Sequence, residues 1–369
     1  MPTDLKNQKP PMHPAAARRI LRLALGTALC LLFSQMAAWP LSFVSPVLTL
    51  FLLALPIPPP TFKKGVVFVL ALLAPLLIGG YILLPFLNDM RAVGLLLVTL
   101  GLFYSFLYSA RGGNPVLGAF MTVGLTVIVT VGSLSAEIVM LLVQGLGVCA
   151  AVAIVFVWIA HALLPDLPPD PALAGMKKPP PPKPSPSNAT HRALRALLIV
   201  LPLAVVFLLS SGSASYTVVM IKVATMGQQA TSAQQSKAMG RSLMESTLWG
   251  GIGAIIAWNV LSIWPSLIMY TLLVGLAGLV YGRWIFQGPA VHPKFQMVQY
   301  AYLTMIVILG PAVLDGAGGS SAGAAFWSRI LLFVLIAVYG TLAVWVFDTL
   351  WPEKTTKKNT PAAAESAPG

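Results

Sequence analysis

The sequence predicts an all-α polytopic membrane protein with about 12 transmembrane helices, arranged as two parallel six-helix repeats. Three observations predict this class: an apolar composition, a central Pro-rich segment between two apolar blocks, and a one-sided distribution of Lys and Arg. The chain is 57% hydrophobic and 9% charged, with a mean hydropathy of +0.84, whereas roughly a quarter of the residues of a soluble domain are charged. The net charge of +13 lies in short loops and tails, so we expect a lipid bilayer rather than nucleic acid as the partner.

The first block covers residues 19–165 and follows a polar N-terminal tail, 1–18. Its first apolar run is too long for the apolar region of a signal peptide, so we expect it to be retained as a helix. A helix needs about 20 apolar residues to span a bilayer. By that rule the first block has six predicted spans: Ile20–Ala38, Leu41–Ile57, Gly65–Leu84, Ala92–Tyr108, Pro115–Val131 and Ile138–Leu163.

A Pro-rich segment, 166–190, separates the first block from the second block, 191–353, and a polar tail, 354–369, ends the chain. A run rich in Pro and Lys cannot bury a core, so we expect an extended cytoplasmic linker. The second block again has six predicted spans: Ala193–Ser210, Ala214–Gln228, Leu243–Leu261, Pro265–Tyr281, Val298–Val313 and Ile330–Leu350.

The Lys and Arg residues predict the orientation of these spans. If the N-terminus lies inside, all of the 23 Lys and Arg residues except Arg91 and Arg329 fall on the cytoplasmic side. Such a bias follows the positive-inside rule. It requires an even number of spans in each block, and it places both termini in the cytoplasm of a cell with the protein in its inner membrane.

Sparse matches between the two blocks indicate an internal repeat. RRILRLAL around Arg22 resembles HRALRALL around Arg195, and Lys64 corresponds to Lys237. Near the block ends, WIAHALLPD (158–166) corresponds to WVFDTLWPE (345–353). The order of the matches is kept along the chain. Because six spans return the chain to its starting side, the two copies share one orientation, with a pseudo-twofold axis along the membrane normal.

A basic start to the first helix, a Pro-bearing second helix and a short basic turn, IPPPTFKKG or ATSAQQSKAMGR, precede a third helix that is Gly-rich. This pattern resembles the fusaric-acid-resistance and aromatic-acid-exporter superfamily of bacterial inner-membrane proteins, in particular its compact members known as a domain of unknown function. The resemblance covers about Arg18 to Glu353. It implies efflux of aromatic or other weak organic acids, often alongside a periplasmic adaptor protein. The large cytoplasmic domain of better-known relatives is replaced here by the Pro-rich linker.

Other function classes remain open at this stage. The major-facilitator fold also has two parallel six-helix halves, but the loops 58–65 and 231–241 lack the acidic residue of its signature. A passive anion channel of the same superfamily and a membrane-embedded enzyme are the alternative functions. We expect no enzyme activity and no cofactor or metal site, since the sequence has no nucleophile triad, metal-ligand spacing or phosphate-binding loop. The sequence leaves open whether the protein is a homo-oligomer.

Candidate substrate-binding residues cluster on the second helix of each block. Short or interrupted spans at matching positions often form transporter sites. Lys222 is a cation inside a span, which is costly unless it faces a cavity or a partner, and the first block has Thr49 at its position. Tyr216 offers a ring for stacking on an aromatic substrate, and Gln228 follows near the inner mouth. The plain alternatives are a structural ion pair, an interfacial ring and a polar loop.

Three residues are candidates for proton coupling. We expect Glu245 to pair with Lys222 near the cytoplasmic face and to take a proton when substrate displaces it. Asp348 and His161 occupy corresponding positions at the inner ends of the last helix of each block, where a proton relay would need such groups. Interfacial structural roles are the plainer interpretation of these two residues.

Overall fold

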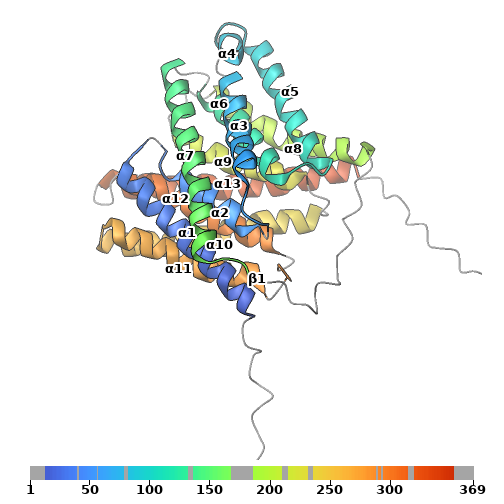
Figure 1. The fold of residues 1–369 in the computed structure, drawn as a ribbon. Coiled ribbons are helices and arrows are strands. Elements are labelled where there is room, and N and C mark those ends of the chain that lie inside the picture. The colour runs from blue at the N-terminus through green and yellow to red at the C-terminus, as the bar shows by residue number, and fades with distance from the viewer. Residues whose placement is uncertain are drawn as a thin grey trace, which may run out of the picture.

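The computed structural model describes residues 13–39, 41–55, 57–78, 82–131, 136–167, 186–209, 215–231, 236–287, 290–291, 294–314 and 320–352. This part of the chain forms 13 helices and one two-stranded hairpin. Eight of the helices are long and apolar enough to cross a membrane. The all-α membrane class predicted from the composition is therefore confirmed (Figure 1).

The helices follow the predicted spans closely. In the first half they are α1 (Pro14–Ala37), α2 (Val44–Ala54), α3 (Phe62–Ile78), α4 (Leu84–Asp89), α5 (Arg91–Ala110), α6 (Pro115–Val131) and α7 (Ala136–Leu163). In the second half they are α8 (Pro186–Leu209), α9 (Ser215–Ala230), α10 (Ser236–Ile263), α11 (Leu267–Ile285), α12 (Phe295–Leu314) and α13 (Ser320–Leu350). The hairpin pairs β1 (Phe286–Gln287) with β2 (Ala290–Val291).

Local sequence explains several helix ends. Pro14 begins α1, and the His13 ring accepts a hydrogen bond from the backbone N–H of Ala15, which satisfies one of the free donors of the first turn. Ser266 caps α11 in the same way, through its Oγ and the N–H of Met269. The short helix α4 and the β1–β2 hairpin are additions that the apolar pattern did not predict, because neither is long enough to span a bilayer.

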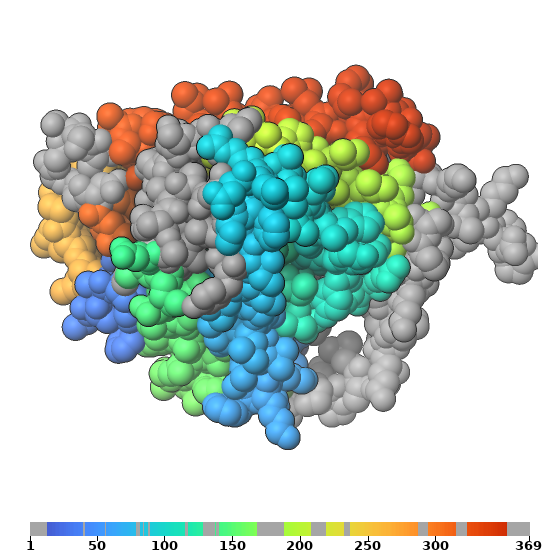
Figure 2. Space-filling view, turned by 90° about the horizontal axis from the view of Figure 1, so that it is seen from above, coloured from blue at the N-terminus to red at the C-terminus, as the bar shows by residue number. Residues whose placement is uncertain are grey.

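The helices pack in matching pairs in the two halves. Within the first half, α1 packs on α2 and α7, and α3 packs on α6 and α7. Within the second half, α8 packs on α9 and α13, and α10 packs on α12 and α13. Figure 2 shows α13 in red along one side of the molecule, with α8 beside it.

One helix of each half packs against the first helix of the other half. Helix α11 of the second half packs against α1, and α5 of the first half packs against α8. Between these outer pairs, α2 packs on α12 and α6 packs on α9. Helices α2, α6, α9 and α12 thus form the contact at the centre of the molecule, and α12 has the largest buried share of the eight long helices.

Close helix contacts depend on glycine at a few positions. A Cβ at Gly278 of α11 would lie 2.7 Å from the Cα of Ala24 in α1, and one at Gly250 of α10 would lie 2.5 Å from the carbonyl oxygen of Ala301 in α12. Glycine at these two positions lets the helix backbones approach closely. Gly251, by contrast, faces open space.

One end of the molecule collects the basic residues. We call it the basic end: α1, α3, α6, α8, α10 and α12 begin there, and α5, α7, α9, α11 and α13 end there. Contacts that join these helix ends include Arg18 Nη1 to the Pro165 carbonyl (3.1 Å) and Gln228 Nε2 to the Gly118 carbonyl (2.9 Å). Figure 1 shows the start of α1 close to β1, in agreement with the contact between them.

Candidate functional site

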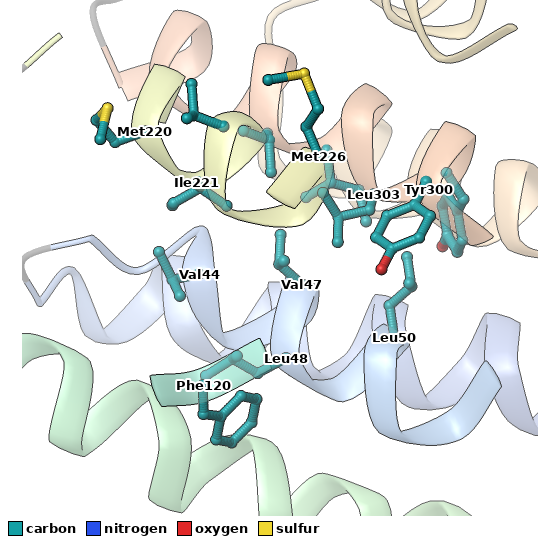
Figure 3. Packing of buried hydrophobic residues seen from close by; sticks show 14 of the residues in the cluster. Val44, Val47, Leu48, Leu50, Phe120, Met220, Ile221, Met226, Tyr300 and Leu303 are labelled. Atoms are coloured by element: carbon teal, nitrogen blue, oxygen red, sulfur yellow. The ribbon is translucent and has the colours of Figure 1, made fainter. Parts of the chain in front are cut away.

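The centre of the molecule holds a small apolar cavity between the two halves. Helices α2, α6, α9 and α12 all contribute to its wall, which includes Val47, Phe120, Ile221, Tyr300 and Leu303. Figure 3 shows Val47, Ile221 and Leu303 between the ribbons of α2, α9 and α12, with Phe120 of α6 on the far side of α2 in this view. The space, which we call the central cavity, measures about 40 Å³. It has room for a few water molecules but not for an organic substrate.

Lys222 lies beside the central cavity, fully inside the protein. Its side chain is 3% exposed, and Nζ donates a hydrogen bond to Oγ1 of Thr304 at 3.0 Å. Two residues of the cavity wall lie close to this hydrogen bond along the helices: Tyr300 is one turn before Thr304 on α12, and Thr225 follows Lys222 on α9. The Lys222–Thr304 pair therefore flanks the cavity wall. In the described residues no carboxylate pairs with Lys222. The ammonium group is thus buried next to a neutral hydroxyl.

Glu245 does not pair with Lys222, and this expectation is wrong. Its Oε1 accepts a hydrogen bond from Nε of Arg241, and its Oε2 lies 3.4 Å from Nζ of Lys294. Glu245 is one turn beyond Arg241 on α10, which favours an ion pair along the helix. The nearby start of α12 supplies Lys294. The periodicity of α10 gives no information on side chains outside that helix, so the contact of Glu245 with Lys294 could not be predicted from it.

Thr49 and Gln228 are both held by hydrogen bonds in the interior. Thr49 donates to the carbonyl of Ser45 at 2.9 Å and lies 3.2 Å from Sγ of Cys30. Gln228 Nε2 donates to the Gly118 carbonyl at 2.9 Å and also to Thr122 Oγ1. Gln228 lines the central cavity and joins α9 to α6. Thr49 is fully buried on α2, in agreement with its match to Lys222.

Tyr216 lies in the first turn of α9, outside the residues whose side chains the structure describes. Its predicted role in stacking on a substrate therefore stays a prediction. Phe120 and Tyr300, which the sequence did not single out, are rings that line the central cavity. Their signal in the sequence is weak, since rings of this kind occur throughout apolar helices.

Asp348 forms an ion pair at the basic end. Nη1 of Arg195 lies 3.2 Å and 3.1 Å from its two carboxylate oxygens, and Arg195 also donates to the Ala230 carbonyl through Nε and Nη2. The first half has a counterpart: Nη1 of Arg22 lies 2.9 Å from Oδ1 of Asp166. Both pairs join the first helix of a half to the end of its last helix. The match between Arg22 and Arg195 in the sequence pointed to similar roles for the two arginines, but their pairing with Asp166 and Asp348 was not predicted.

His161 lines a larger cavity of about 430 Å³ at the basic end. Its Nδ1 lies 2.8 Å from the Val157 carbonyl, while Nε2 is buried without a hydrogen-bond partner in the described residues. Lys63 and Lys64 also line this space, which we call the first-half cavity. A second space of about 380 Å³, the second-half cavity, lies at the starts of α10 and α12 and contains Glu245.

No cluster of His, Cys, Asp and Glu that could hold a metal ion occurs in the described ranges. Cys30 and Cys149 are buried free thiols. Cys149 accepts a hydrogen bond from the Trp39 ring N–H at 3.2 Å. The thiols therefore contribute to packing between α1, α2 and α7.

Comparison with known families gives one match. Residues 19–160 match the family model described as "Protein of unknown function (DUF2955)". The match covers less than half of the chain, from α1 into α7, and it begins and ends close to the limits of the first predicted block. No curated protein matches the chain, and no solved structure does. The first half is thus similar to a family whose function has not been assigned.

Proposed function

We propose that the protein exports organic anions, with aromatic carboxylic acids as the leading substrate class, across a bacterial inner membrane. The observation that carries the proposal is Lys222, a cation buried between the halves next to Thr304. A buried ammonium without an anion is unfavourable by several kcal/mol. A carboxylate that passes between α2, α6, α9 and α12 would relieve that cost while it is bound, so Lys222 is the residue assigned to the substrate's charge.

The packing of the helices supports the proposed repeat. When the six spans of each half are numbered in order, with α4 set apart, each pair that packs in the first half also packs in the second. Between the halves, the first span of each half packs on the fourth span of the other: α1 on α11, and α8 on α5. We therefore interpret the chain as two parallel six-helix repeats. The basic end faces the cytoplasm in this proposal, with both termini and the linker on that side.

The conformation described here is closed. The central cavity of about 40 Å³ is smaller than any aromatic acid, so transport requires the two halves to move apart. Short helices at the contact between repeats are typical of transporter binding sites, and α2 has only 11 residues. A rocking motion of the halves would open the space beside Lys222 to one side of the membrane at a time.

Energy for export would come from a proton gradient or from an outside partner. Glu245 and Asp348 are each held by an arginine, so coupling through a Lys222–Glu245 pair is not part of the proposal. His161 has no ion-pair partner in the described residues and remains the candidate for proton coupling. The fusaric-acid-resistance resemblance suggests a periplasmic adaptor protein, which is part of the same proposal.

Flux of radiolabelled benzoate through proteoliposomes tests the function. In Lys222→Met the flux should fall to that of protein-free vesicles, while the purified protein keeps its melting temperature, because Met fills the same volume without a charge. Arg283→Met, which removes an exposed cation at the end of α11, is the matched control and should keep its flux. Unchanged benzoate flux in Lys222→Met would exclude the central lysine as the substrate-binding group. Flux that needs no imposed proton gradient would identify a channel instead of an exporter.

A further inference from the structure

We propose that the first-half cavity is a second organic-anion site, a vestibule that binds an aromatic carboxylate before it reaches the central cavity. The inference deepens the proposed function, since it names the same substrate class. Four helices contribute to the cavity: α3 and α6 begin at it, and α2 and α7 end at it. Its volume of about 430 Å³ falls within the range of small-molecule sites, about 300–1,000 Å³.

The cavity has an apolar floor and a basic rim. The buried side chains of Phe68 and Val157, together with Leu117, form the floor. The rim carries polar groups and cations: Lys63, Lys64, Asn114 and His161. This distribution fits a ligand with an apolar ring and a single anionic group, because the ring leaves water while the anion stays near the cations.

The charge of the rim has no compensation within the cavity. No acidic residue lines it, and neither Lys63 nor Lys64 forms an ion pair with any described residue. Both lysines lie in the first turn of α3, where the positive end of the helix dipole disfavours a cation and favours an anion. A bound carboxylate would therefore be stabilised by two lysines and a helix terminus together.

His161 adds a polar ring to the wall of the cavity. Its Nδ1 points to the Val157 carbonyl, which assigns the ring proton to Nδ1 in the neutral tautomer. Nε2 is then an acceptor without a partner. Because Nε2 is closed off from the cavity in this ring position, the two lysines and not His161 supply the charged contacts to a bound carboxylate.

Two phenylalanines connect the first-half cavity to the centre. Phe68, on the floor of the first-half cavity, packs edge-on against Phe120, whose ring lines the central cavity, with ring centroids 6.4 Å apart. Helix α2 borders both spaces, through Leu52 on one side and Phe51 on the other. The vestibule and the central cavity are thus separated by one pair of rings.

Calorimetric titration of the purified full-length protein with 2-naphthoate tests the vestibule. Lys63→Gln combined with Lys64→Gln should raise the dissociation constant about tenfold or more, because charge-assisted hydrogen bonds are lost. Leu117→Trp, which fills the cavity and keeps its charge, should also abolish binding at this site. Lys237→Gln, the corresponding change beside the second-half cavity, is the matched control and should bind as the parent does. Naphthalene-2-carboxamide, which lacks the charge, should bind to none of these proteins.

The outcomes separate this site from the central one. The vestibule is wrong if 2-naphthoate binding survives the Lys63 and Lys64 changes but disappears in Lys222→Met, a result that would leave the proposed function standing. Binding that persists in Lys222→Met and is lost in the double variant supports the vestibule, whatever the flux assay shows. Titrations are repeated in nanodiscs of phosphatidylcholine alone and with phosphatidylglycerol. Displacement of 2-naphthoate by phosphatidylglycerol would assign the cavity to a lipid headgroup and overturn the proposal.

Discussion

At the basic end, the first-half cavity and the second-half cavity both lie where two helices begin, α3 and α6 in one and α10 and α12 in the other. They differ in how their cations are balanced. In the second half Glu245 lies between Arg241 and Lys294, so the protein supplies its own anion. In the first half Lys63 and Lys64 meet no acid that lines the space. The second-half cavity thus holds a filled ionic cluster, and the first-half cavity is an open basic site.

A second contrast concerns the two arginines that join the first helix of each half to the end of its last helix. Arg195 is 1% exposed and makes hydrogen bonds to both Asp348 and the Ala230 carbonyl. Arg22 is almost as buried, with 4% of its side chain exposed, but its partner Asp166 is 47% exposed whereas Asp348 is 19% exposed. Burial makes an ion pair more sensitive to the loss of one partner. The second half should therefore depend on its arginine more strongly than the first half does.

The largest predicted effect tests that contrast. Arg195→Met should lower the free energy of unfolding by about 3–5 kcal/mol, since it leaves Asp348 and a buried carbonyl without a partner. Arg22→Met should cost about 1 kcal/mol or less, because Asp166 can be solvated. Melting temperatures of the detergent-purified proteins, followed by intrinsic fluorescence, measure the difference. Equal shifts in the two variants would show that the halves are closed with equal strength.

A medium effect is expected at the tightest helix contacts, where the halves should behave alike. Gly250→Ala places a methyl group against the Ala301 carbonyl, and Gly124→Ala places one 2.8 Å from the Leu72 carbonyl between α6 and α3. Each should destabilise the protein by about 1–3 kcal/mol through overpacking. Gly251→Ala meets nothing within 4 Å and is the matched control; it should be neutral or slightly stabilising. A loss of stability in Gly251→Ala would indicate a backbone requirement instead of close packing.

The smallest effect on stability comes with a change in binding. Glu245→Gln removes the internal anion of the second-half cavity, which should cost less than about 1 kcal/mol because its partner Arg241 is 73% exposed. Three cations, Lys237, Arg241 and Lys294, would then surround the space. Calorimetry should detect an additional 2-naphthoate site in this variant. Glu137→Gln, which removes an exposed carboxylate in the first turn of α7, should not add one.

The apolar pattern predicted nearly all of the helices, because burial in a bilayer imposes a minimum length that sequence alone reveals. It also placed Lys222 inside a helix, where its burial is now described. The partners of the charged residues were harder to predict. Glu245 was expected beside Lys222, yet Lys294, 49 positions away along the chain, reaches it. Side-chain pairing depends on how helices cross, and hydrophobic periodicity carries no information on crossing.

The first-half cavity was also beyond prediction from sequence. Lys63 and His161 are separated by nearly a hundred residues, and each has an ordinary interpretation when taken alone. What joins them is the contact of α3 with α7, at which the Trp158 ring N–H donates to the Pro60 carbonyl at 2.7 Å. The Pro run before α3 thus docks on the end of α7 and fixes one wall of the space. The sequence contained the residues but not this docking.

The exchange of α5 and α11 between the halves has a consequence for how the protein is made. The face of α1 that α11 covers includes Ile20, Ala24 and Ala28, which meet Gly282, Gly278 and Gly275. Helix α1 leaves the ribosome long before α11 does, and at 5–20 residues per second the interval is on the order of tens of seconds. During that time lipid or an insertion factor must cover this face. The first half therefore cannot complete its packing before the second is synthesised, and a ribosome that stalls in the linker leaves this face of α1 without its partner helix.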